Sequence, residues 1–151
     1  MSSYWSLFPD FDHNEHAPLQ EEFARLAEQN NWDGDDDRSK AIRRIQWGRC
    51  FRLEFNKHYG EDASSLAGWQ ALCKEVRLQN IPESVEECKR ALKGRVWVNI
   101  VDLVDCRRTG QKVKRHKTEE ALRRYTKSTE KIFPKREAKE NGFLTALLIT
   151  L

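Results

Sequence analysis

The sequence predicts a mostly α-helical fold, a compact domain of about five to six helices. Apolar residues recur at spacings of three and four along most of the chain, as on the buried face of a helix. Ser, Thr, Asp or Asn stands before several of these stretches, where a helix N-cap belongs. The length of 151 residues suits one domain with a real core. A small β element of two or three strands is compatible with the C-terminal half.

A first helix is expected to open at Pro18, because proline suits the first helical position. Its apolar face has the spacing i, i+4, i+7, i+8 and consists of Leu19, Phe23, Leu26 and Ala27. The preceding residues 1–16 are predicted to be a flexible N-terminal segment. Residues 17–151 are then predicted to form a single helical domain.

A second helix is predicted over residues 38–59. The Asp-rich stretch 30–37 reads as an exposed loop, Asp37 is the expected cap, and Gly60 ends the helix. We assign to its buried side Ile42, Ile45, Cys50, Phe51, Phe55 and Tyr59. A third helix is expected to run to about Leu78, before the sequence Asn-Ile-Pro at 80–82 breaks it.

The fourth helix has a clear start, because Ser84 and Glu87 form the Ser-x-x-Glu pattern of a capping box. Together with the third helix it resembles a helix-turn-helix, although the turn is about two residues too long. Arg77 also stands where glycine is common, and acidic residues lead the second helix. The pair is therefore either a DNA-reading unit or a packed helical hairpin.

The C-terminal half mixes strand and helix signals. Residues 96–105 begin with β-branched residues, but Asn99 is a good helix cap, so a strand followed by a short helix is favoured. Residues 112–116 are a candidate edge strand that 131–133 could pair with, and Thr118 caps a helix between them. A last helix is expected from Pro134, with a final apolar stripe formed by Phe143, Leu144, Leu147 and Leu148.

Charge is distributed unevenly along the chain. Residues 1–38 hold ten acidic and two basic residues, a sum of −8, whereas residues 107–139 hold thirteen basic and four acidic, a sum of +9. One interpretation is a solvated surface with mutual attraction between the two ends. The other is that the basic third meets a polyanion, because clustered Lys and Arg release counterions from phosphate chains.

No sequence pattern of a known catalytic centre or phosphate loop is present. The carboxylates and imidazoles between Asp10 and His16 lack the spacing of a metal site, and Asp102 with Asp105 is more typical of capping or ion pairing than of catalysis. The four cysteines lie 23, 15 and 18 residues apart, which predicts reduced thiols rather than zinc ligands. We expect no enzyme, no metal and no cofactor.

Membrane insertion and secretion are not expected. The longest uncharged, apolar-leaning run, residues 142–151, is far shorter than the roughly 20 residues that span a bilayer. The N-terminus lacks the basic region of a secretory signal. A cytoplasmic or nuclear location is predicted.

Five short motifs resemble a family of small fungal, ascomycete-type proteins of uncharacterised function. They are Asp-His-Asn-x-His-Ala-Pro at 12–18, Trp-Gln-x-Leu-Cys at 69–73, Cys-Lys-x-Ala-Leu-Lys at 88–93, Val-Asn-Ile-x-Asp-Leu-Val at 98–104 and Ile-Phe-Pro-x-x-x-Ala-Lys at 132–139. The resemblance spans about residues 5–148. It implies a stand-alone fungal domain and brings no activity, ligand or site residue.

The sequence thus favours a non-enzymatic interaction domain that contacts DNA or RNA through its basic C-terminal third and the helical pair. The alternative is a protein–protein adaptor that does not bind nucleic acid. The candidate nucleic-acid-binding residues are Lys89, Arg90, Lys93, Arg95, Arg107, Arg108, Lys112, Lys114, Arg115, Lys117, Arg123 and Arg124. Their convergence on one face would favour the first hypothesis, and their scatter the second.

Overall fold

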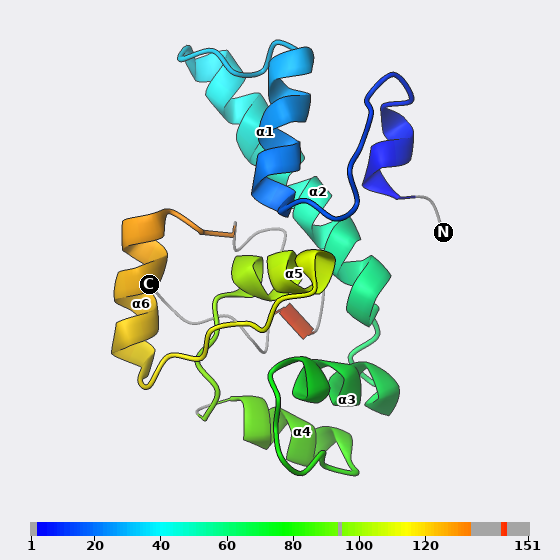
Figure 1. Ribbon diagram of the computed structural model, residues 1–151, viewed down its shortest axis with the longest axis vertical. Coiled ribbons are helices and arrows are strands. Elements are labelled where there is room, and N and C mark those ends of the chain that lie inside the picture. The colour runs from blue at the N-terminus through cyan, green and yellow to red at the C-terminus, as the bar shows by residue number, and fades with distance from the viewer. Residues whose placement is uncertain (1–2, 94, 134–142, 145–151) are drawn as a thin grey trace.

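The structure is a computed structural model and describes residues 3–93, 95–133 and 143–144. A short 3-10 helix, η1 (Tyr4–Leu7), precedes six α-helices (Figure 1). These are α1 (Leu19–Gln29), α2 (Asp37–Tyr59), α3 (Leu66–Glu75), α4 (Val85–Leu92), α5 (Ile100–Thr109) and α6 (Glu119–Thr129). The mostly α prediction is confirmed. Within the described residues the β structure consists of one isolated antiparallel bridge, between Trp97 and His116.

Helix boundaries follow the capping residues of the sequence. Gly60 ends α2 with φ +82°, in the left-handed region that glycine tolerates best. The cap of α2 is Asp36 rather than Asp37, because the Asp36 carboxylate accepts the backbone N–H of Ser39. Three predicted caps form, each accepting a backbone N–H of the first turn, and these are Ser84, Asn99 and Thr118.

The long helix α2 organises the fold. Figure 1 shows α1 beside the N-terminal part of α2, η1 nearer the middle of α2, and α5 beneath α1. The pair α3 and α4 follows the C-terminal end of α2, and α6 stands at the edge of the molecule. One hydrophobic cluster joins η1 and helices α1 to α5, and it extends to Leu144. Phe51 and Phe55 of α2 lie fully buried within it.

Residues 3–16 pack onto this body instead of forming the flexible segment predicted for 1–16. Tyr4, Trp5 and Phe11 are all at least 90% buried. The Tyr4 hydroxyl also donates a 2.9 Å hydrogen bond to the side chain of Gln46 in α2. The segment lacks helical periodicity, but aromatic side chains bury enough surface to hold it in place.

Two further local predictions are wrong. Ile45 is 51% exposed, because it precedes Phe51 by six residues, which places it about 120° around the helix. Residues 131–133 form no strand, and instead the Lys131 carbonyl accepts a hydrogen bond from the Asn99 side chain. The expected helix from Pro134 and the residues Leu147 and Leu148 lie outside the described residues.

Cys50, Cys73 and Cys88 are buried free thiols, and Cys106 is partly buried. Burial is the largest influence on the Cys50 thiol and raises its pKa well above the usual value. These cysteines pack as small apolar side chains, as the sequence predicted. In the part of the chain that the structure describes, no helix is long and apolar enough to cross a membrane.

Candidate nucleic-acid interface

The connection from α5 to α6 carries the densest positive charge, and we call residues 112–117 the basic segment. Its chain is fixed on two sides. The His116 N–H donates a 2.8 Å hydrogen bond to the Trp97 carbonyl, and the Arg77 guanidinium donates a 2.9 Å hydrogen bond to the Val113 carbonyl. Val113 itself is buried. The segment is therefore a fixed extended strip, which crosses the molecule in Figure 1.

Four cations of the basic segment are exposed, namely Lys112, Lys114, Arg115 and Lys117. The segment contains no acidic residue, and no carboxylate of the described residues forms an ion pair with any of the four. The Lys114 ammonium lies 5.5 Å from the centre of the Tyr125 ring, a cation–π contact with α6. The four cations therefore remain exposed to water within one short stretch of chain.

One cation that follows α4, Arg95, lies near the basic segment. Arg95 precedes Trp97 by two residues, and the bridge between Trp97 and His116 brings its chain beside the basic segment. Arg90, Lys93 and Arg95 are all exposed. We define the basic surface as Arg90, Arg95, Lys112, Lys114, Arg115 and Lys117.

Arg90 and Arg95 also line a hollow of about 330 Å³ beside α4, which we call the α4 hollow. Its other lining residues are Asn80, Pro82, Glu87 and Ala91. Two hydrogen bonds fix the position of the lining residue Pro82. Its carbonyl accepts one of 2.9 Å from the Gln70 side chain and one of 3.7 Å from the Cys88 thiol. Arg90 and Arg95 thus join the basic surface to a shallow hollow with both apolar and polar lining.

The pair of helices α3 and α4 packs together but does not have helix-turn-helix geometry. Residues 76–84 separate the two helices, whereas the turn of that motif has three or four residues. Arg77 adopts φ +62°, the left-handed conformation for which glycine is preferred. Glu86 and Glu87 are exposed in the first turn of α4 and would repel phosphates. The pair is therefore better described as a helical hairpin.

The remaining sequence candidates are placed less favourably. Lys89 is half-buried, with its ammonium 5.7 Å from the centre of the Trp69 ring. Arg123 pairs with Glu119 at 2.6 Å. Arg107, at the end of α5, and Arg124, on α6, are exposed but belong to other elements than the basic surface.

Arg108 does not reach the surface, so its assignment to the interface is corrected. Its side chain is 1% exposed and forms an ion pair with Glu54 of α2. It also donates a 2.7 Å hydrogen bond to the Ala17 carbonyl and one of 2.9 Å to the Asn14 carbonyl. The reason is periodicity, because Arg108 follows Val104 by four residues on the inward face of α5.

Arg108 belongs to a buried polar network that also contains His13. The His13 ring stacks on Trp5 with 3.8 Å between ring centres, and its Nδ1 lies 3.0 Å from a carboxylate oxygen of Glu22. Its Nε2 faces Arg108 at 3.4 Å. Burial, and then the charge of Arg108, lower the pKa of His13 below its usual value.

The Glu54 carboxylate of this network stays ionised. Burial disfavours its charge, but His58 and Arg108 outweigh burial and lower its pKa to about 2. These contacts join the N-terminal segment, α2 and α5, so we assign the network a role in stabilising the fold. Within the described residues no three His, Cys, Asp or Glu side chains gather as metal ligands would.

Asp102 and Asp105, the pair considered for acid–base catalysis, are both engaged in contacts between elements of the fold. Asp102 accepts hydrogen bonds from the Tyr125 hydroxyl at 2.6 Å and from the Lys131 ammonium at 2.7 Å. Asp105 accepts the backbone N–H of Leu19 at 2.8 Å, at the start of α1. The first aspartate therefore joins α5 to α6, and the second joins α5 to α1.

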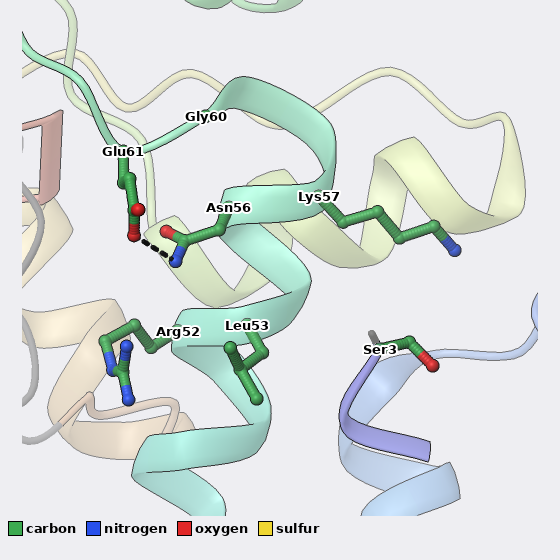
Figure 2. A pocket seen from close by; sticks show the side chains of 7 residues that line it. All are labelled: Ser3, Arg52, Leu53, Asn56, Lys57, Gly60 and Glu61. Atoms are coloured by element: carbon green, nitrogen blue, oxygen red, sulfur yellow. Dashed lines mark hydrogen bonds between the residues drawn. The ribbon is translucent and has the colours of Figure 1, made fainter. Parts of the chain in front are cut away.

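A second hollow, of about 340 Å³, lies between the C-terminal end of α2 and the residue before η1 (Figure 2). Within it Asn56 donates a 2.9 Å hydrogen bond to Glu61, and Leu53 supplies apolar surface. Figure 2 shows the Lys57 side chain extending away from this Asn56–Glu61 pair. The mixture of groups does not select one class of ligand.

Three residues outside the set of candidate nucleic-acid-binding residues shape the interface. Arg77 and Trp97 fix the backbone of the basic segment, and Tyr125 underlies Lys114. Only Arg77 carried a signal, as a charged residue at a position where glycine is common. The contacts of all three link positions far apart in the chain, so no local pattern records them.

Comparison of the chain with protein-family models, with curated proteins and with solved structures gives no match.

Proposed function

We propose that this protein is a non-enzymatic interaction domain that binds the phosphate backbone of DNA or RNA through the basic surface. Exposed Lys and Arg neutralise phosphates and release their counterions, which supplies most of the sequence-independent affinity for nucleic acids. Such a role is compatible with either the cytoplasm or the nucleus. The helical hairpin of α3 and α4 contributes cations rather than a recognition helix.

The observation that carries this proposal is the state of the four cations of the basic segment. They are exposed and share one strip that holds no carboxylate. Hydrogen bonds from Arg77 and to Trp97 hold that strip, so a ligand does not have to order it. Preorganisation of this kind lowers the entropic cost of binding.

The test is fluorescence anisotropy with labelled DNA and RNA at about 50 and 200 mM salt. In the test variant Lys112, Lys114, Arg115 and Lys117 are all replaced by Gln. If each contacts a phosphate, the slope of log affinity against log salt should flatten by up to about four units. The control replaces four exposed cations of α2 by Gln, namely Arg38, Lys40, Arg44 and Arg49, and changes the net charge equally.

Equal losses in both variants would show that only net charge matters and would overturn the assigned surface. The second candidate function is a protein-binding adaptor, to which the exposed apolar side chains of Leu7, Ile45 and Ile132 would contribute contacts. Absence of wild-type binding at about 50 mM salt would reject nucleic-acid binding in favour of the adaptor.

A further inference from the structure

We propose that the α4 hollow receives one unpaired guanine base of a single-stranded nucleic acid whose backbone lies on the basic surface. This inference rests on the proposed function and adds to it a strand preference and a base preference. Arg95 connects the two sites, because it lines the hollow and adjoins the basic segment. A strand that runs along the cations would therefore pass the mouth of the hollow.

The lining of the hollow has the chemistry of a base site. Pro82 and Ala91 offer apolar surface for the faces of a planar ring. Arg90 and Arg95 supply N–H donors only, Glu87 supplies acceptors only, and the Asn80 amide supplies both. Its volume of about 330 Å³ lies at the small end of the range for ligand sites, which suits one nucleotide better than a folded element.

Guanine matches this set of donors and acceptors better than the other bases. Its O6 and N7 are two adjacent acceptors that an arginine can bind together. Its N1–H and N2–H₂ groups are donors on the neighbouring edge, where a carboxylate such as Glu87 accepts them. Adenine lacks the O6 acceptor, and uracil offers no amino group to a carboxylate.

A single strand is required because pairing occupies the donor edge of guanine in a duplex. Taking a paired base out of its stack costs a few kcal/mol. An unpaired base avoids most of this cost, since binding sites for single strands combine a cationic groove with contacts to exposed bases. Phosphate contacts on the basic surface position the strand, and the hollow reads one base.

The experiment compares two labelled 12-nucleotide oligouridines that carry either guanine or adenine at one central position. Affinities are measured by anisotropy at about 50 mM salt for the wild type, Glu87→Gln and Glu86→Gln. Glu86 is the matched control, because it precedes Glu87 on α4, is exposed and does not line the hollow. The readout is the ratio of the two affinities, so the shared change in net charge cancels.

We expect the wild type to bind the guanine oligomer about fivefold more tightly or better, the least that one good bidentate contact provides. Glu87→Gln should lower the ratio, because it removes the carboxylate that accepts both N1–H and N2–H₂ of guanine, and Glu86→Gln should leave the ratio unchanged. The same sequence annealed to its complement should show no guanine preference. Thermal unfolding of both variants checks that α4 remains folded.

Two results separate failure of this inference from failure of the proposed function. Equal wild-type affinity for both oligomers, or loss of the preference in Glu86→Gln as much as in Glu87→Gln, overturns the base site and leaves backbone binding in place. If neither oligomer binds, and longer DNA and RNA do not bind either, both the base site and the proposed function are overturned.

Discussion

Replacing Arg108 by Met should destabilise the protein severely, although the new side chain is apolar and similarly long. The Arg108 guanidinium donates to the Glu54 carboxylate and to the carbonyls of Asn14 and Ala17. The side chains of Arg108 and Glu54 are 1% and 3% exposed. The substitution therefore leaves a buried carboxylate with His58 as its remaining side-chain partner and deprives two carbonyls of a donor.

The expected magnitude follows from the burial of both charges. Removing one partner of a buried ion pair costs about 3–5 kcal/mol, because the other charge stays desolvated. In a domain of this size each kcal/mol lowers the melting temperature by about 2–4 °C, so a fall of about 6–20 °C is expected. The double variant Arg108→Met, Glu54→Leu should recover much of the loss, since no unpaired charge remains.

Urea unfolding followed by tryptophan fluorescence measures these free energies. The control is Arg107→Met, the exposed neighbour, which should change the free energy of unfolding by no more than about 0.5 kcal/mol. If Arg108→Met lies within 1 kcal/mol of the wild type, or if the double variant is less stable than Arg108→Met alone, the assignment of a buried, mutually dependent pair is refuted.

Three further predictions concern other parts of the fold. Ser84→Ala should cost about 0.5–2 kcal/mol in urea unfolding, because the Glu87 N–H loses its acceptor, and an unchanged midpoint would contradict the cap. Glu130→Gly should stabilise the protein by about 1 kcal/mol in thermal unfolding, because Glu130 has φ +57°, a conformation that glycine adopts without steric cost. A lower melting temperature would show instead that the Glu130 side chain contributes to stability. Stability should fall as the pH drops below about 6.5, because the lowered pKa of His13 means that the unfolded chain binds the proton more readily. His13→Gln should weaken this fall below about pH 6.5, and exposed His16→Gln should not, so identical stability profiles for the two variants would contradict the role of His13.

Local features of the fold could be predicted from the sequence, and features that join distant segments could not. Ser84, Asn99 and Thr118 cap helices as expected, because a cap involves only the residue and the next turn. Tyr4 and Trp5 looked mobile because they lack periodicity, yet the tertiary fold buries them. Flexibility inferred from an irregular pattern fails where aromatic residues find a core elsewhere in the chain.

The candidate interface shows the same limit. The exposed cations of residues 112–117 were identified correctly as a concentration of charge, because composition alone reveals it. Arg108 was placed in the same set, although the spacing from Val104 already pointed it inward. Its partner Glu54 lies 54 residues earlier in the chain, so no local pattern indicated that the charge of Arg108 would be neutralised inside the fold.

The long reach of Arg108 also bears on how the chain folds during its synthesis. Its bonds to Ala17 and Asn14 connect residues 91 and 94 positions apart. On the ribosome, η1, α1 and α2 leave the exit tunnel well before α5 does. Until residue 108 has been synthesised, packing α1 against α2 would bury the Glu54 carboxylate without its arginine partner. The early chain therefore gains little stability by forming its hydrophobic core. Non-local contacts of this kind slow folding, and they make α5 the helix whose emergence allows the N-terminal half to become compact.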